Sequence, residues 1–193
     1  MLTGLVLAGG RSVRMGHDKA SLVLADGRTL LQRQVEELRS TGVARVFVAV
    51  RPGGALDLPG VRWVEDGIEQ AGPMAGLAAG LQASPPGLVL ALAVDMPGVT
   101  SVHLRQLLAQ ATPDEGAVPV IGGQIEPLAG IYPAGLAASA NAWLASGQRS
   151  VQAWVRSEVA KESLRLWETP PGWATAFRSW NTPADAADGS ARL

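Results

Sequence analysis

The chain has 193 residues, enough for one ordinary domain. Hydrophobic residues make up 47% and charged residues 17%, which supports a large core and excludes a disordered chain. Sixteen basic and seventeen acidic side chains leave a formal charge of −1, which argues against a nucleic-acid-binding protein. Cysteine is absent, which excludes disulfides, thiolate metal sites and a cysteine nucleophile.

The N-terminal apolar run shows no targeting signal. It has no basic residues before it and reaches a glycine too early for a signal peptide. No stretch approaches the ~20 apolar residues that a membrane span needs. We therefore expect a cytoplasmic protein without membrane contact.

Apolar runs and amphipathic segments alternate along the first part of the chain. The run at 2–8 is unbroken, as in strands that are buried on both faces. Apolar residues at 30, 31, 35 and 38 predict an amphipathic helix over 29–40. The further predicted elements are strands at 45–50 and 61–65, a helix at 73–83, a strand at 88–94 and a helix at 101–111. This alternation predicts a mostly parallel sheet with helices on both faces.

The remaining part of the chain is less regular. It predicts strands at 117–121, 126–132 and 164–168, and helices at 134–146 and 151–160. No linker of domain size interrupts the sequence. We therefore expect one α/β domain, a Rossmann-like three-layer α/β/α sandwich, over residues 1–193.

The loop after the first strand combines glycines with cations. Gly9 and Gly10 let backbone N–H groups approach an anion closely, and Arg11, Arg14 and Lys19 come within nine positions. Such a loop suits a di- or triphosphate, although its spacing fits neither the Walker pattern nor the dinucleotide-binding glycine pattern. A glycine turn flanked by solvated basic side chains is the alternative.

Other strands also end in residues that suit a nucleotide site, and the carboxyl ends of parallel strands share one edge. Asp95 ends the most apolar run, where an unpaired charge is unfavourable unless a cation such as Mg²⁺ meets it. Asp66 comes directly after another strand. The segment 72–76 (GPMAG) opens a helix with small residues and free N–H groups, which suits a flat base or an anion. Ordinary turns and helix caps are the structural alternatives for all three.

The histidines and tryptophans receive structural interpretations. His103 lies in a predicted helix and is expected at the surface. The six tryptophans are scattered, four of them over helical or irregular segments, which favours core packing over base stacking.

The motif LAGGRSVRMGHDK at 7–19 resembles the signature of nucleotidyltransferases that activate small phosphorylated acceptors. The segments 72–76, 95–97 (DMP) and 181–183 (NTP) come after it in the order found in the molybdenum cofactor guanylyltransferase family, which the whole chain resembles. The double glycine and GPMAG favour the guanylyl branch, since cytidylyl relatives usually carry an alanine where Gly9 stands.

The resemblance implies a Mg-dependent transfer of GMP from GTP to molybdopterin or the molybdenum cofactor, with release of pyrophosphate. It divides the chain into a nucleotide-binding half at 1–112, an acceptor-binding half at 113–183 and a tail at 184–193. It also implies transient contact with molybdenum insertion proteins and apo-molybdoenzymes. The alternatives are a cytidylyltransferase or another nucleotidyltransferase acting on a phosphorylated small molecule, and a non-catalytic GTP-binding accessory protein for cofactor delivery.

The same resemblance, carried over position by position, assigns roles to individual residues. Lys19, Asp95 and Arg14 would be catalytic, with Asp95 holding the magnesium ion. The GTP-binding residues would be Leu7, Ala8, Gly9, Gly10, Lys19, Asp66, Gly72, Gly76 and Asp95. The acceptor-binding residues would be Arg149, Arg156 and Asn181. The family often has Asn-x-Asn-Thr-Pro near its end, but Ser179 replaces the first asparagine here, so only Asn181 is retained.

Overall fold

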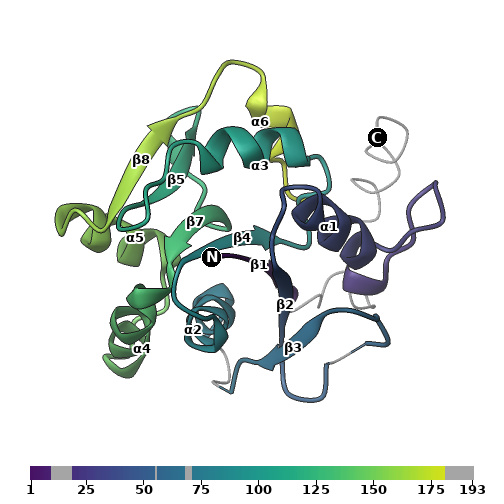
Figure 1. The fold of residues 1–193 in the computed structure, drawn as a ribbon, viewed down its shortest axis with the longest axis horizontal. Helices are drawn as coiled ribbons and strands as arrows, with labels where there is room; N and C mark the ends of the chain where they lie inside the picture. The colour runs from purple at the N-terminus through teal and green to yellow at the C-terminus, as the bar shows by residue number, and fades with distance from the viewer. Residues whose placement is uncertain (10–18, 55, 68–70, 181–193) are drawn as a thin grey trace.

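A mixed sheet of eight strands lies between two layers of helices in the computed structural model, which describes residues 1–9, 19–54, 56–67 and 71–180 (Figure 1). The strands are β1 (Leu2–Leu7), β2 (Arg45–Val50), β3 (Arg62–Glu65), β4 (Leu88–Ala93), β5 (Gly116–Ile121), β6 (Gln124–Ile125), β7 (Ala129–Pro133) and β8 (Leu164–Glu168). The α-helices are α1 (Leu30–Arg39), α2 (Pro73–Ala83), α3 (Ser101–Leu108), α4 (Ala137–Ala145), α5 (Val151–Ala160) and α6 (Trp173–Ala176). Two short 3₁₀ helices are η1 (Lys19–Ser21) and η2 (Ala134–Leu136).

The sheet has the order β3–β2–β1–β4–β7–β5–β6, and β8 pairs with β5. The first four strands in this order are parallel to one another. Strand β7 runs antiparallel to both β4 and β5, whereas β8 is parallel to β5. The expected α/β sandwich with a mostly parallel sheet is therefore confirmed.

Alternate residues of the central strands point into two separate cores. In β1, Val6 belongs to a core that also contains residues of α1, α3 and α6, whereas Leu5 and Leu7 belong to a second core with residues of α2, α4 and α5. This is the consequence of the period of two along a strand. A strand with helices on both faces needs apolar residues at every position, which explains the unbroken apolar runs of β1 and β4.

Local signals set the starts of the helices. Thr29 caps α1 by accepting a hydrogen bond from the backbone N–H of Gln32, whose side chain accepts one in return from the N–H of Thr29. Pro73 occupies the first turn of α2, where its missing N–H would have no helical partner. Ser150 caps α5 by accepting from the N–H of Ala153.

The second half of the chain departs from the sequence prediction. The strand predicted at 126–132 begins only at Ala129, because the preceding residues form a turn in which the N–H of Leu128 donates to Glu126 Oε1. The hydroxyl of Tyr132 donates to the carbonyl of Pro127 and holds this turn against the strand. The helix predicted at 134–146 is divided into η2 and α4, the helix predicted at 101–111 ends at Leu108, and β6 and α6 were not predicted.

His103 is half-buried, so its predicted surface position is wrong. Its ring packs edge-on against Trp173 and Phe177 of the C-terminal segment, with ring centroids 4.9 and 5.9 Å away. Burial lowers the pKa of His103 below its usual value. Trp154, Trp173 and Trp180 are buried, which confirms core packing for these three. Within the described ranges, no helix has the length and apolar character needed to cross a bilayer.

Candidate active site

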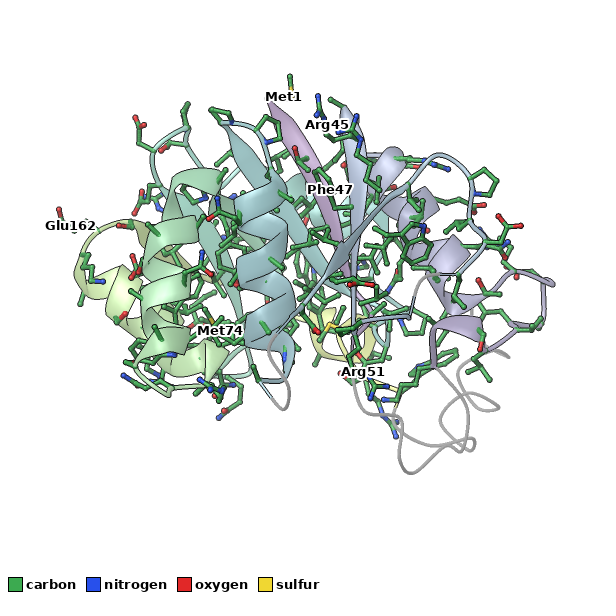
Figure 2. All side chains as sticks on the ribbon, turned by 90° about the horizontal axis from the view of Figure 1, so that it is seen from below. Met1, Arg45, Phe47, Arg51, Met74 and Glu162 are labelled. Carbon is green, nitrogen blue, oxygen red and sulfur yellow. The ribbon has the colours of Figure 1, made fainter. Side chains whose placement is uncertain are left out.

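The carboxyl ends of the parallel strands and the start of α2 lie at one edge of the sheet. Figure 2 shows Met1 and Arg45, at strand starts, at one end of the molecule, and Arg51 and Met74 at the opposite end. A pocket opens at the end of the molecule where the parallel strands finish. Its lining residues are Leu7, Ala8, Gly9, Lys19, Ala49, Asp66, Gly72, Pro73, Gly76, Ala93, Val94, Asp95 and Leu128.

Most of the predicted nucleotide-site residues line this one pocket. These are Leu7, Ala8, Gly9, Lys19, Asp66, Gly72, Gly76 and Asp95. Gly10, Arg14 and Asn181 lie outside the described residues. The pocket therefore brings together the ends of three strands and the first turn of α2, as the parallel topology requires.

Lys19 and Asp95 form an ion pair on one wall of the pocket. Lys19 Nζ lies 3.2 Å from Asp95 Oδ2, although the two residues are 76 positions apart in the sequence. Strand β4 ends at Ala93, and Asp95 follows it after Val94. Lys19 is the first residue of η1. The backbone N–H of Trp180 donates to the main-chain carbonyl of Asp95 at 2.8 Å. The pocket thus offers a cation and a carboxylate within reach of one phosphate chain.

Asp66 forms another part of the pocket wall and is only 7% exposed. Its backbone N–H donates to the carbonyl of Val50, which ties the residue to the end of β2. Burial raises the pKa of Asp66 to about 6, and the positive charge of Arg51 opposes part of that rise. Asp66 is therefore mainly ionised at neutral pH and can accept hydrogen bonds from a ligand.

Small residues, namely Gly9, Ala49, Gly72 and Gly76, also line the pocket and are called its floor here. A Cβ added at Gly9 would lie 2.8 Å from Asp66 Oδ2, so any other residue there would press on this carboxylate and require it to shift. Gly72 begins α2 with a positive φ of 62°, which favours glycine. Ala49 and Gly76 line the same floor. The resulting slot suits a flat ring, and the N-terminus of α2 beside it favours an anion.

Two charged residues near the pocket received no site role from the sequence. Arg51 comes directly after β2, and the rule that ligands meet the carboxyl ends of parallel strands could have found it. Glu126 precedes β7, which is antiparallel to β4, so its position depends on a strand direction that the sequence does not reveal. Burial raises the pKa of Glu126, and the negative charge of Asp95 raises it further.

Asp95 fits a magnesium ion that arrives with a nucleotide. Among the described residues, no group of three or more His, Asp or Glu side chains could hold a metal ion. Magnesium, however, is commonly held by one or two carboxylates together with ligand phosphates and water. The Asp95 carboxylate can supply the protein's oxygen ligand in such a site, and Lys19 beside it can contact the same phosphates.

The arginines predicted for acceptor binding do not line the pocket. Arg149 donates to the carbonyls of Leu144 and Gln148, at 2.8 and 2.9 Å, and so caps the C-terminal end of α4. Arg156 lies on the exposed side of α5. An acceptor role for either residue stays a prediction.

Comparisons with known proteins agree with this geometry. Residues 4–162 match the model of the MobA-like NTP transferase domain. A protein of Opitutus terrae named probable molybdenum cofactor guanylyltransferase is 38% identical over 187 residues, which cover 95% of this chain and 92% of that protein. A protein of the same name from Mycobacterium marinum is 35% identical over 95% of this chain and 90% of its own length.

Solved structures of low sequence identity share the fold. The molybdopterin-guanine dinucleotide biosynthesis protein A from Archaeoglobus fulgidus matches with a TM-score of 0.75 and 20% identity, over 98% of this chain and 97% of that one. The 2-C-methyl-D-erythritol 4-phosphate cytidylyltransferase from Thermus thermophilus matches with a TM-score of 0.73 and 23% identity, over 98% of each chain. Because the family model covers most of the sequence and the curated relatives nearly all of it, the chain belongs to the MobA-like NTP transferase family of nucleotidyltransferases.

Proposed function

We propose that the protein transfers GMP from GTP to the phosphate of molybdopterin or of its molybdenum-loaded form, with release of pyrophosphate. The observation that carries this proposal is a pocket that is lined by the Lys19–Asp95 ion pair, by the buried Asp66 and by a floor of small residues. The names of the curated relatives support molybdopterin as the acceptor.

Guanine is the base that best suits the Asp66 wall. Guanine carries two neighbouring donors, the ring N1–H and the 2-amino group, and a carboxylate can accept from both. Cytosine lacks the ring donor. An alanine at position 9 would press its methyl group against Asp66 Oδ2, so Gly9 keeps this acceptor open to the base.

The proposed reaction is an in-line displacement at the α-phosphorus of GTP. A phosphate oxygen of the acceptor forms the new bond to phosphorus, and the bond to the bridging oxygen breaks as pyrophosphate leaves. That acceptor oxygen is already anionic near pH 7, so no residue has to remove a proton from it. The chain's task is therefore to align two anions and to neutralise their charge.

Three parts of the pocket can supply that neutralisation. The Lys19 ammonium donates to phosphate oxygens as the negative charge shifts towards the leaving group. The N-terminus of α2 adds its partial positive charge at Gly72. Asp95 would hold magnesium, which supplies charge neutralisation on the phosphates when it is bound.

The test is a turnover assay with the purified protein, molybdopterin, Mg²⁺ and a panel of GTP, CTP and ATP. We expect pyrophosphate release with GTP and a product mass equal to molybdopterin plus GMP. Lys19→Ala should lower turnover strongly. Lys161→Ala is the matched control, because this lysine pairs with Glu158, which does not line the pocket, and it should leave turnover unchanged.

Two results would overturn the proposal. A preference for CTP would make the protein a cytidylyltransferase. Binding of GTP without pyrophosphate release would make it an accessory protein that carries a nucleotide.

A further inference from the structure

The loop that carries Asp95 is held by polar side chains of α1, a helix that does not line the pocket. The side chain of Gln34 is fully buried, and its Nε2 donates to the carbonyls of Ala93 at 3.0 Å and Met96 at 2.8 Å. These two carbonyls stand on either side of Asp95. The side-chain amide of Gln34 therefore links the backbone before Asp95 to the backbone after it.

Neighbouring residues of α1 hold the rest of the same loop. The Nε of Arg33, which is only 7% exposed, donates to the carbonyl of Pro97 at 2.7 Å. A carboxylate oxygen of Glu37 accepts from the backbone N–H of Ser101 at 2.6 Å, at the start of α3. Figure 1 shows α1 and α3 on the same side of the sheet. The segment from β4 to α3 is thus attached to α1 at several points along its length.

Gln34 is an unfavourable choice for packing alone. Its Oε1 is buried without a hydrogen-bond partner among the described residues. A buried acceptor without a donor lowers stability, whereas an apolar side chain would fit this core position without that penalty. The two donated hydrogen bonds are what an apolar side chain could not supply.

We infer that Gln34 is a positioning residue for Asp95: its amide fixes the loop so that the carboxylate faces Lys19 and the pocket. The carbonyl of Asp95 itself is bonded to the N–H of Trp180, so the loop is held from both sides. The inference rests on the role proposed for Asp95 in holding the metal ion with the nucleotide. Gln34 does not itself line the pocket and would act through the main chain of Ala93 and Met96.

The test uses Gln34→Met, which keeps the length of the side chain and removes both donors together with the unpaired acceptor. Binding of Mn²⁺ in the presence of GTP, without acceptor, is measured from the paramagnetic resonance signal of the free ion. We expect about tenfold weaker Mn²⁺ binding, the usual effect of losing a partner that orients a metal ligand. Loss of the two hydrogen bonds should also lower the melting temperature, so it is the change in Mn²⁺ binding that distinguishes a positioning role from a purely structural one.

Ser139→Ala is the matched control. It removes two hydrogen bonds in the network with Trp154 and Glu158, residues that do not line the pocket. It should lower the melting temperature and leave Mn²⁺ binding unchanged. If Gln34→Met does not fold, Gln34→Leu is used instead. It removes the same polar groups with a side chain of different shape, and its Mn²⁺ binding is measured in the same way.

Asp95→Asn separates failure of this inference from failure of the proposed function. If Asp95→Asn leaves Mn²⁺ binding unchanged, the metal-holding role of Asp95 is wrong. If Asp95→Asn weakens Mn²⁺ binding but the Gln34 variants bind as the unaltered protein does, Gln34 does not position Asp95 and the inference is overturned.

Discussion

The parallel half of the sheet, β1 to β4, and the half that contains the antiparallel strand β7 contribute residues to the pocket from opposite ends of their strands. In the parallel half, β1, β3 and β4 deliver Gly9, Asp66 and Asp95 after their last residues. In the other half, β7 is antiparallel to β4, so Leu128 reaches the pocket from before the first residue of its strand. The backbone N–H of Ala93 donates to the carbonyl of Leu128 at 2.7 Å, which fixes the two halves together at this point.

This difference assigns different work to the two halves. The parallel half holds the charged pair and the carboxylate that would meet the nucleotide. The antiparallel half closes the pocket with a buried turn, in which Tyr132 and Glu126 hold the backbone. Changes in the first half should therefore act on turnover and nucleotide choice, and changes in the second half on stability.

The largest effect is expected from Asp95→Ala. The variant takes away the carboxylate that pairs with Lys19 and removes the residue proposed to hold the metal ion. Turnover with GTP and Mg²⁺ should fall by about two to three orders of magnitude, comparable to the loss of one preorganised electrostatic contact. Circular dichroism should show the same fold. Near-normal turnover would contradict the assignment.

Gly9→Ala is expected to have the next largest effect. The added methyl group would lie 2.8 Å from Asp66 Oδ2, so the carboxylate must move or be covered. The kcat/KM for GTP should fall by about 10- to 100-fold, the size of one lost hydrogen bond to a charged group. The ratio of GTP to CTP use, measured in competition, should fall with it. An unchanged ratio would remove Asp66 as the base-reading group.

The pH dependence of GTP use should report the ionisation of Asp66. Its pKa of about 6 lies above the ordinary value because burial disfavours the charged form. Below this pH the carboxyl gains a proton and loses acceptor capacity, so kcat/KM for GTP should fall about tenfold between pH 7 and pH 5.

Arg51→Ala sharpens the pH measurement. The positive charge of Arg51 opposes the rise in the pKa of Asp66, so removal of this charge should raise the pKa further. The fall in kcat/KM on the acid side (the acid limb) should then move to higher pH. The kcat/KM for GTP is measured across the same range for Asp66→Asn, which should show no such limb. An acid limb that persists in Asp66→Asn would belong to another group.

The smallest effect on turnover is expected from Tyr132→Phe in the antiparallel half. The buried hydroxyl donates to the carbonyl of Pro127, which would be left without this donor. Unfolding in urea should show a loss of about 1–2 kcal/mol, and turnover should change less than threefold. A large fall in turnover at unchanged stability would show that this turn takes part in the reaction.

The parallel half could be predicted well from the sequence, because its strands alternate with helices and its apolar runs have sharp ends. Asp66 and Asp95 are predictable because each stands just beyond the end of a strand, and Arg51 occupies the same kind of position after β2. Glu126 could not be found in this way, since nothing in the sequence around it states the direction of β7. Gln34 gives no signal at all, because its partners are main-chain carbonyls that every residue carries.

The Lys19–Asp95 ion pair has a consequence for the way a ligand enters the pocket. The ammonium and the carboxylate compensate each other at 3.2 Å, so neither charge has to be solvated alone at the half-buried end of β4. A magnesium triphosphate brings a positive and a negative group of its own, and both side chains can exchange their mutual contact for one with the ligand. In the proposed reaction, loading would therefore replace the contact between the two side chains by two contacts with the ligand, Lys19 with a phosphate and Asp95 with the metal ion.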